Sequence, residues 1–503
     1  MSLQETIDRA TQPINDFMLD LSGYVWYIGL AMAVMAGVYF LFRFRGVQIV
    51  RLPEQLRLMV RDAREKGDGG KVSSFQAFCM GLGQRIGIGN IVGVATAILL
   101  GGPGAIFWMW IFALLGAATS FVECTLGQIF KSRDSEGRLR GGPAFYIANG
   151  LKNHRLAVFF AVWTVITYGV GFVANVSAVS RGSFETIFGG DLVPVVTAVV
   201  LSVLTAYLVF GGMRRISRMA QYVVPVMALG WMLLTAVTVV MNWHLIDDVI
   251  MLILTDAFDL TKIAAGFTGS CVMCGKKRGV FSNEAGIGSI PSVASLSDVR
   301  HPVRQGYLQS LGVLVDTLVI CSASAFMILM AFPEGLGLPY DADSGVVIVE
   351  DAMSMLLGGD WSKYILVAFI AVFGFTSLIG NYTVSESNLR FVTESGRALT
   401  AHRAIAVVTV FVASMLPISL VWNSVDVLMA VMTITNIYVL FRLHRYVVSA
   451  HDDYRRQRDA GTDEPVFTSE VLEKDGLDVS GVECWDSANR SAGCEMTRSR
   501  DVY

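Results

Sequence analysis

Long runs of apolar residues that carry almost no charge recur along this chain, and they restrict its possible folds more than any other feature. A helix needs roughly 20 apolar residues to cross the hydrocarbon core of a bilayer. The runs that contribute to such helices are 21–42, 86–122, 156–180, 192–213, 219–246, 263–275, 305–333, 364–385, 404–424 and 427–441. The second run is long enough for parts of two helices, split by a glycine-proline turn at 101–104. The sequence therefore predicts an all-α polytopic membrane protein with about eleven transmembrane helices.

The composition agrees with a membrane protein and argues against several other classes. Hydrophobic residues make up 53% of the 503 residues, charged residues 16%, and the formal net charge is −3. The chain is too apolar for one or two soluble domains, and its charge indicates no nucleic-acid partner. The sequence has no phosphate-binding loop and no Ser-His-Asp arrangement, so we expect neither an enzyme nor an ATP-driven pump, and no organic cofactor. The seven cysteines form no disulfide framework, and Cys271 and Cys274 are expected to be small packing residues.

The distribution of Lys and Arg predicts the orientation, because basic loops stay on the cytoplasmic side. Most basic residues fall on one side if the N-terminus lies outside and the C-terminus in the cytoplasm. We therefore expect a multi-pass protein of the plasma (inner) membrane. Residues 1–20 would be extracytoplasmic, and 51–67 would form an amphipathic segment at the inner interface. Residues 448–503 would be a cytoplasmic tail that is disordered, because from about residue 451 the chain is polar and of mixed charge.

Two predicted helices do not read as plain spans. Helix 2, near 73–98, and helix 7, near 264–290, are both interrupted by glycines and polar residues. Irregular backbone at membrane depth is tolerated only where it is buried in protein or lines a watered cavity. The two helices are five apart, so 73–246 and 263–447 would be inverted five-helix repeats, with 21–46 as an additional helix. This pattern is typical of a secondary transporter whose site lies where the repeats meet.

The stretch "GQRIGIGNIVGVA" at 83–95 lies in the first interruption. Unwound backbone there would expose N–H groups for a substrate carboxylate and C=O groups for a cation. The alternative is that the small residues Gly89 and Gly93 serve helix packing, which is the commoner use of such spacing. A dinucleotide-binding loop is excluded by the glycine spacing and by the lack of a preceding strand.

Four segments resemble the alanine/glycine:cation symporter family, also called the sodium:alanine symporters. They are "GIGNIVGVATAILLGGPGAIFWMW" (87–110), "RGGPAFYIANGL" (140–151), "KRGVFSNEAGIGSIPSVASLSDVRHPVRQG" (277–306) and "FGFTSLIGNYTVSESNLRF" (373–391). The resemblance covers about residues 20–447. It implies a leucine-transporter-like fold of five plus five inverted helices, carried on helices 2–11. It also implies import of small neutral amino acids with Na⁺ or, in some members, H⁺.

Carried over by position, the resemblance predicts which residues form the sites. The substrate would contact unwound backbone and nearby side chains at Gly87, Ile88, Gly89, Asn90, Asn175, Phe267, Thr268 and Ser270. Ile88 departs from the family, which more often has threonine there. Na⁺ would be held by the carbonyls of Gly83 and Ile86 and the hydroxyls of Thr376 and Ser377, since neutral oxygens suit a hard monovalent cation. Without the motif, Thr376 and Ser377 would more commonly bond to their own helix backbone. The amide of Asn175 could equally form a helix–helix hydrogen bond, and Phe267 could equally face lipid.

Charged residues near membrane depth require partners, because inserting a charge costs roughly 2.5–3.5 kcal/mol. Arg85, Glu123, Glu284 and Asp316 are of this kind. We expect Arg85 to pair with Glu284 and so to brace the two broken helices as a gate. Glu284 as a proton site, or simply as an interfacial residue, stays open as an alternative.

The leading functional hypothesis is Na⁺-coupled import of alanine or glycine by alternating access. Its expected partners are the amino acid, Na⁺ and the lipid bilayer, with no obligatory protein partner. The alternatives are an H⁺-coupled symporter, or a non-transporting receptor or channel on the same fold. A channel would need a continuous polar path, whereas the polar residues cluster in the middle of the predicted membrane span.

Overall fold

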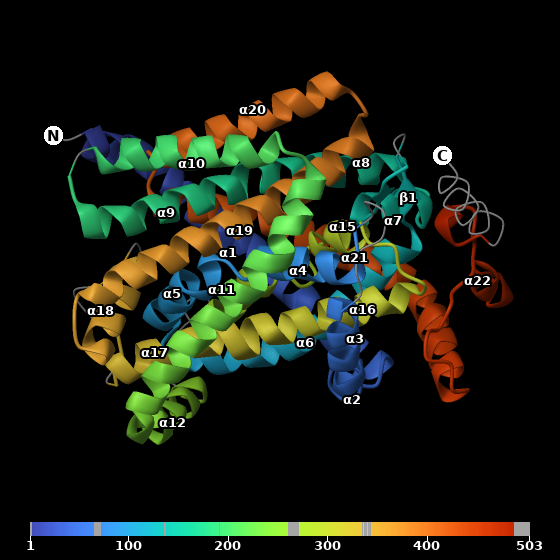
Figure 1. The fold of residues 1–503 in the computed structure, drawn as a ribbon, viewed down its shortest axis with the longest axis horizontal. Helices are drawn as coiled ribbons and strands as arrows, with labels where there is room; N and C mark the ends of the chain where they lie inside the picture. The colour runs from blue at the N-terminus through green and yellow to red at the C-terminus, as the bar shows by residue number, and fades with distance from the viewer. Residues whose placement is uncertain are drawn as a thin grey trace.

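The structure is a computed structural model that describes residues 3–64, 72–134, 137–190, 192–259, 271–333, 335–336, 340 and 344–486. The chain forms a bundle in which most of the long helices run roughly in one direction (Figure 1). The α12 and α18 helices lie at one end of the bundle, and α7, α22 and the strand β1 lie at the other.

The N-terminal half of the described chain contains the first interrupted helix. Its elements are α1 (Leu3–Arg43), α2 (Val47–Val50), α3 (Leu52–Arg64), α4 (Ser74–Arg85), η1 (Ile88–Asn90), α5 (Val92–Gly101), α6 (Gly104–Ile129), β1 (Ser132–Arg133), β2 (Leu139–Arg140), α7 (Pro143–Asn149), α8 (His154–Ile166), η2 (Thr167–Phe172), α9 (Val173–Phe188), α10 (Val193–Val209), α11 (Met213–Met241), η3 (Trp243–Leu245) and α12 (Ile246–Ala257). The two short strands pair antiparallel, with Ser132 opposite Arg140. The η2 segment is a π-helix that joins α8 to α9.

The C-terminal half contains the second interrupted helix and a short ordered segment after the last long helix. Its elements are α14 (Cys271–Asn283), α15 (Ile290–Ala294), α16 (Pro302–Leu314), η4 (Val315–Cys321), α17 (Ser322–Ala331), α18 (Gly345–Leu357), α19 (Trp361–Val392), α20 (Gly396–Ala413), α21 (Ile418–Asp459), α22 (Glu470–Lys474) and η5 (Glu483–Trp485). The η4 segment is also a π-helix, a form that often occurs at functional sites.

Eight helices in the described chain are long and apolar enough to cross a membrane. They are the spans of α1, α6, α8 to α9, α11, α16 to α17, α19, α20 and α21. The other three predicted spans correspond to α10, which has 17 residues, and to the interrupted pairs α4–α5 and α14–α15. The prediction of a helical multi-span protein is thus confirmed, whereas the count of eleven and the inverted repeat stay predictions.

The first interruption follows directly from local sequence. The α4 helix begins with a capping box in which Ser73 and Gln76 exchange hydrogen bonds of 3.1 Å, and it ends at Arg85. The chain then turns through η1 before α5 begins. The side-chain carbonyl of Asn90 accepts a hydrogen bond of 2.9 Å from the backbone N–H of Gly87. This side chain therefore satisfies a backbone group that the break would otherwise leave unpaired.

The second interruption lies between α14 and α15, in the sequence "EAGIGS" at 284–289. Three residues there have positive φ: Glu284 at 54°, Gly286 at 83° and Gly288 at 91°. Glycine adopts such angles without strain, but glutamate does so rarely. The positive φ of Glu284 marks a residue that its surroundings hold in place, as is common at functional sites.

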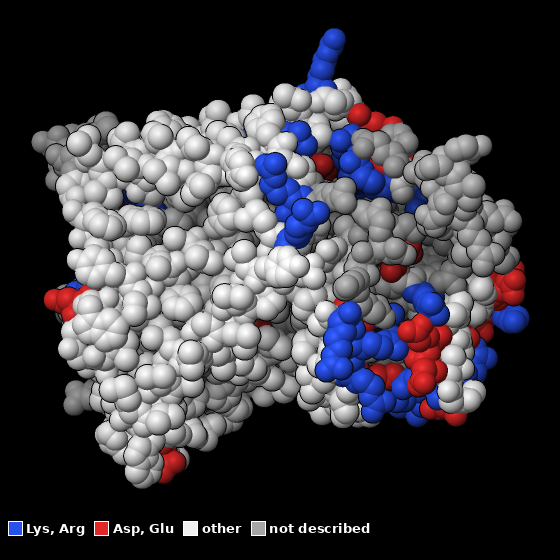
Figure 2. Space-filling view, viewed as in Figure 1, with Lys and Arg blue, Asp and Glu red and all other residues white. Residues whose placement is uncertain are grey.

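Exposed Lys and Arg gather on one half of the molecule in the face drawn in Figure 2, the half that carries α3, while the opposite half shows few charged side chains. The α3 helix buries Gln55, Leu58 and Asp62 against the bundle and exposes Arg57 and Arg64. The α3 helix is therefore amphipathic, and its place at the inner membrane interface stays a prediction.

The prediction that residues 448–503 form a disordered tail is wrong for 448–486. The α21 helix continues to Asp459, and the chain after it packs back on the bundle with Phe467, Leu472 and Trp485 buried. The indole N–H of Trp485 donates 2.9 Å to the carbonyl of Gln128. The burial of these three residues on the rest of the protein therefore suffices to fix this polar segment.

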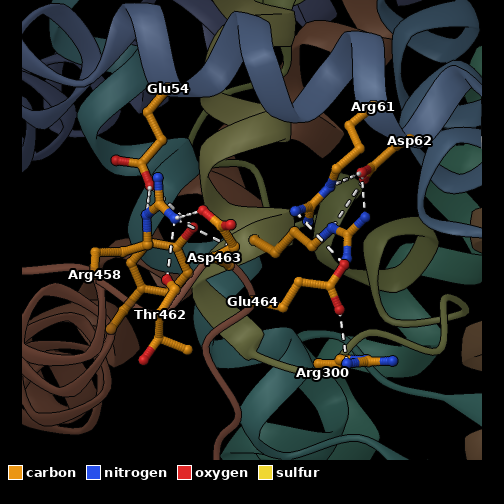
Figure 3. Close-up of polar contacts among 10 residues, drawn as sticks. Glu54, Arg61, Asp62, Arg300, Arg458, Thr462, Asp463 and Glu464 are labelled. Atoms are coloured by element: carbon orange, nitrogen blue, oxygen red, sulfur yellow. Dashed lines mark hydrogen bonds and ion pairs between the residues drawn. The ribbon is translucent and has the colours of Figure 1, made fainter. Parts of the chain in front are cut away.

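Ion pairs also join the C-terminal segment to α3 (Figure 3). Arg458 contacts Glu54 at 3.1 Å, and Glu464 contacts Arg300 at 2.7 Å and Arg61 at 3.6 Å. These pairs connect the segment to α3 and to the loop before α16. Since the side chains are partly exposed, each pair contributes little by itself to stability.

Replacing Trp485 by alanine is expected to destabilise the protein by about 3–5 kcal/mol, the usual cost of removing a buried tryptophan. The measurement is the apparent melting temperature of the purified protein in detergent. Trp243→Ala is the control, because Trp243 is 71% exposed, and it should leave the melting temperature nearly unchanged. Equal melting temperatures for Trp485→Ala and the wild type would mean that the segment does not pack as described.

Candidate substrate and ion site

A small buried cavity lies where the two interrupted helices meet η2, α9 and α19. We call it the central cavity. Its volume is about 20 Å³, which is room for about one water molecule. A larger ligand can therefore bind only if the side chains around the cavity move apart.

Four buried side chains in the wall of the central cavity have polar atoms without a hydrogen-bond partner among the described residues. The atoms are Gln84 Oε1, Asn175 Nδ2, Ser377 Oγ and Asn381 Oδ1. None of the four residues is more than 5% exposed. An unsatisfied buried polar atom costs roughly 1–3 kcal/mol, so four in one cavity indicate a site that a polar ligand completes.

The rest of the cavity wall is largely apolar and aromatic. Phe172 and Phe281 stack on one another with ring centroids 5.3 Å apart, and Ile88 and Val176 complete this wall. A methyl group added at Gly89 would lie 3.0 Å from the Phe281 ring, so η1 approaches α14 closely. The wall leaves little space for a large side chain on a ligand.

Gly87 brings the first interruption into contact with α19. A Cβ atom added at this position would overlap Ser377 Oγ. The backbone of Gly87 is extended, with φ −139°, so the close approach and not a special dihedral angle requires glycine. The structure thus places Gly87, which directly precedes η1, in the cavity wall together with Ile88 and Gly89 of η1 and Asn175 of α9.

Asn90 lies away from this group and ties the first interruption to η4. Its amide donates 2.6 Å to Asp316 Oδ1, while Asp316 Oδ2 accepts from Ser282 at 2.7 Å and Thr317 at 3.0 Å. Asp316 therefore links both interrupted helices, because Asn90 belongs to η1 and Ser282 to α14. Its buried carboxylate is satisfied by neutral donors.

The predicted direct pairing of Arg85 with Glu284 is wrong. Arg85 donates to the carbonyl of Asn283 at 2.8 Å, to Gln309 at 3.0 Å and to Ser120 at 2.9 Å. Arg85 still bonds across to the end of α14, but to the backbone beside Glu284. The end of α4 turns so that Gln84 faces the carboxylate instead.

Glu284 Oε2 accepts three hydrogen bonds from different parts of the bundle. The donors are Gln84 at 2.5 Å, Ser289 at 2.5 Å and Tyr168 at 3.1 Å. The carboxylate thus connects α4, η2 and both sides of the second interruption. Gln84, and not Arg85, therefore makes the side-chain hydrogen bond from the first interrupted helix to Glu284, and a gating role for this contact stays a prediction.

Glu123 fastens the second interruption from another side. Its carboxylate accepts from the Gly286 N–H at 3.2 Å and from the Asn436 amide at 2.9 Å, while Asn436 also bonds to Tyr146. The partners that the sequence required for Glu123 are therefore backbone and neutral amide groups.

Three of the four residues predicted to hold Na⁺ are divided between two cavities, and the fourth, Ile86, lines neither. Gly83 and Thr376 line a cavity of about 10 Å³ between α4, α11 and α19, whereas Ser377 lines the central cavity. The Thr376 hydroxyl donates 3.0 Å to the Phe373 carbonyl of its own helix. Ile86 is fully buried at the end of α4. Of the two predicted hydroxyls, only that of Ser377 is unpartnered.

Three further residues predicted to contact the substrate, Phe267, Thr268 and Ser270, lie outside the described part of the chain. The second interruption that the structure describes comes later, at 284–289. Glu284 of this interruption and Phe281 of the preceding α14 helix line the central cavity.

Sequence reasoning missed several residues of the cavity wall, namely Gln84, Phe172, Val176, Phe281 and Asn381. Helical periodicity could have identified two of these residues. Asn381 lies one turn after Ser377 on α19, and Phe172 lies three residues before Asn175, so each shares a helix face with a predicted site residue. Phe281 carries no such signal without knowledge of how α14 packs.

Two interrupted helices that enclose a buried, polar and incompletely satisfied cavity, within a multi-span membrane protein, define a secondary transporter. Comparison with known proteins identifies the family. The sequence profile of the sodium:alanine symporter family matches residues 11–469. The chain belongs to this family, and it is accordingly a transporter and not an enzyme.

Named relatives extend over nearly the whole chain. A probable sodium/glutamine symporter of Bacillus subtilis is 38% identical, with 91% of this chain and 92% of the relative aligned. An amino-acid carrier protein of the same organism is 35% identical, with 94% of this chain and 97% of the relative aligned. A sodium/alanine symporter of Methanococcus maripaludis is 32% identical, with 85% of this chain and 94% of the relative aligned. The relatives thus bear the names of different amino acids.

Proposed function

We propose that this protein couples the entry of Na⁺ to the import of a small neutral amino acid, alanine or glycine, by alternating access. The observation that carries the proposal is the set of four unpartnered polar atoms around the central cavity. Amino-acid zwitterions need both donors and acceptors, and the cavity offers both within an enclosed space.

The substrate carboxylate would bind the backbone N–H groups of Ile88 and Gly89, beside the amide of Asn175, because the Gly87 N–H already donates to Asn90. The ammonium group would bind carbonyl oxygens of Gln84 and Asn381, which lack donors. The aromatic wall of Phe172 and Phe281 favours a small side chain, since a longer one must displace the stacked rings. This wall is our reason to favour alanine or glycine over glutamine.

Na⁺ would bind near the end of α4, at the Ser377 hydroxyl with the carbonyls of Gly83 and Ile86. Thr376 would join this site only after its hydroxyl leaves the Phe373 carbonyl. A cation there would bridge α4 to α19, so that Na⁺ and substrate stabilise the same arrangement of the first interruption. The half of the molecule that carries α3 and the C-terminal segment would face the cytoplasm, because the basic residues gather there.

Coupling to protons is the alternative, and one observation favours it. Glu284 lines the central cavity and is held in a rare backbone conformation. A carboxylate in that place could carry a proton together with the substrate.

Uptake of labelled alanine into proteoliposomes under an inward Na⁺ gradient, compared with an inward H⁺ gradient at the same voltage, tests the proposal. We expect the Na⁺ gradient to drive uptake in the wild type. Ser377→Ala should lower Na⁺-driven uptake about tenfold, because it removes an unpartnered oxygen from the site, while Thr376→Ala should have a smaller effect. Uptake driven by H⁺ alone would transfer the coupling site to a carboxylate, and the absence of alanine and glycine uptake under both gradients would overturn the proposal.

A further inference from the structure

A second group of unpartnered polar atoms lies on the other side of the aromatic wall from the central cavity. Trp422 of α21 stacks on Phe281, with ring centroids 5.0 Å apart, and Phe281 in turn lines the central cavity. The guanidinium of Arg278 lies 4.6 Å above the Trp422 ring. Arg278 is three residues before Phe281 on α14, which is about one helical turn.

Three polar atoms in this group have no hydrogen-bond partner in the described chain: Arg278 Nη1, Trp422 Nε1 and Asp426 Oδ1. Trp422 and Asp426 are four residues apart on α21, so they share one face of that helix. Trp422 is 5% exposed and Asp426 is 3% exposed. Two N–H donors and one carboxylate oxygen therefore lack partners in this group, in which Trp422 and Asp426 are buried and Arg278 is half-buried.

The two opposite charges do not neutralise each other directly. Arg278 and Asp426 form no ion pair with one another or with any other described residue. A structural salt bridge between the half-buried Arg278 and the buried Asp426 would be expected to close, because leaving a buried charge unpaired is costly. Each of the two charged groups therefore stays available to a ligand group of the opposite charge.

The neighbouring basic residues of α14 behave differently. Lys276 donates 3.0 Å to the carbonyl of Leu30, and Lys277 donates 3.0 Å to the hydroxyl of Ser22. Both lysines thus fasten α14 to α1. The guanidinium of Arg278, by contrast, has no hydrogen-bond partner in the described chain. It lies over the Trp422 ring of α21 instead.

From this geometry we propose that Arg278, Trp422 and Asp426 form an outer site that receives an amino-acid zwitterion before it reaches the central cavity. The substrate carboxylate binds the N–H groups of Arg278 and Trp422, and its ammonium group binds Asp426. A halide would leave Asp426 unsatisfied, and Na⁺ would leave Arg278 unsatisfied. A zwitterion satisfies both.

The stacked rings of Phe281 and Trp422 separate the outer site from the central cavity. Because Trp422 belongs to both the outer site and the partition, binding of a substrate there acts directly on the ring that closes the passage. The outer site therefore determines how fast substrate reaches the central cavity, and it leaves the equilibrium affinity of that cavity unchanged.

This inference rests on the proposed function, and its test separates the two. Purified wild-type protein and variants are mixed with labelled alanine in Na⁺, and binding is followed over time and to equilibrium. Arg278→Gln and Asp426→Asn are expected to slow association about tenfold, the lower end of the effect of charged groups on association rates. Their equilibrium affinity should stay within about twofold of the wild type, because a group on the path changes association and dissociation alike.

Lys276→Gln is the matched control, since it removes a neighbouring positive charge of the same helix that is already bonded to the Leu30 carbonyl of α1. It should leave the association rate unchanged. If Arg278→Gln does not fold, as judged by its melting temperature, Arg278→Lys should fold and show an intermediate rate, because it keeps the charge and loses the planar fork. Wild-type association rates in Arg278→Gln and Asp426→Asn, or a lowered equilibrium affinity with an unchanged rate, would overturn the outer site. Failure of the wild type to bind or transport alanine would count instead against the proposed function.

Discussion

Gly87→Ala is expected to lower alanine uptake about tenfold to hundredfold, since overpacking a closed site costs roughly 1–3 kcal/mol. The added methyl group would overlap Ser377 Oγ, and α19 and the first interruption would have to separate. Alanine can adopt the extended backbone of this position, so the effect comes from the contact and not from dihedral strain. The measurement is the initial rate of Na⁺-driven uptake into proteoliposomes, normalised to the amount of inserted protein.

Gly23→Ala is the control for the Gly87 substitution. A Cβ atom at Gly23 has no neighbour within 4 Å, and in the middle of α1 alanine favours the helix. Uptake by this variant should equal that of the wild type. If Gly87→Ala transported as well as Gly23→Ala, the first interruption could not lie against Ser377 during transport.

Glu284→Gln is expected to lower uptake by about tenfold to hundredfold, because hydrogen bonds to a buried charged group contribute roughly 1.5–3 kcal/mol each. In the wild type one carboxylate oxygen accepts from Gln84, Ser289 and Tyr168. The amide carbonyl of glutamine lacks the charge that strengthens these bonds. Its NH₂ group adds a further hydrogen-bond donor to a place where the neighbouring groups are donors already. The brace between the two interrupted helices would therefore loosen.

The ion dependence of the residual uptake in Glu284→Gln distinguishes bracing from proton transport. If Glu284 only braces, the slow uptake should still follow the Na⁺ gradient. Glu185→Gln is the control, since Glu185 lies on α9 and pairs with Arg181 through a carboxylate that is 41% exposed. Full transport by Glu284→Gln would contradict the bracing role, and loss of H⁺-driven uptake in that variant alone would favour the proton alternative.

The long helices could be predicted because a bilayer imposes the same demand on every spanning segment. The interruption at η1 could be predicted as well, since glycines and polar residues within an apolar run indicate irregular backbone that protein or a cavity must enclose. The hydrogen-bond partner of Glu284 on α4 could not be predicted. Gln84 and Arg85 are adjacent in sequence, and only the direction in which α4 ends decides which of them faces the carboxylate.

The ordered C-terminal segment shows a second limit of the sequence. Residues 460–486 are polar, and their apolar members are too far apart to form a core of their own. Phe467, Leu472 and Trp485 are buried because the rest of the protein offers surfaces that receive them. Local composition contains no information on such surfaces, so a compositional argument predicts disorder.

The location of the second interruption illustrates the same point for the site. The glycines of "GFTGSCVMCG" and those of "EAGIGS" equally permit irregular backbone. The sequence therefore predicts substrate contacts at residues 267–270 from the first of these two stretches. The interruption described by the structure is at 284–289, where Glu123, Gly286 and Asn436 form a network that fixes the backbone. These partners come from segments more than a hundred residues away, which no local pattern predicts.

The central claim is that Na⁺ and a small amino acid bind together at the interrupted helices. The most direct test is equilibrium binding of labelled alanine to the purified protein at increasing Na⁺ concentration, in the wild type and in Ser377→Ala. Two ligands that stabilise the same arrangement must raise each other's affinity by the same factor. We predict that alanine affinity rises with Na⁺ in the wild type and depends much less on Na⁺ in Ser377→Ala. Alanine affinity that is the same with and without Na⁺ in the wild type would contradict the account.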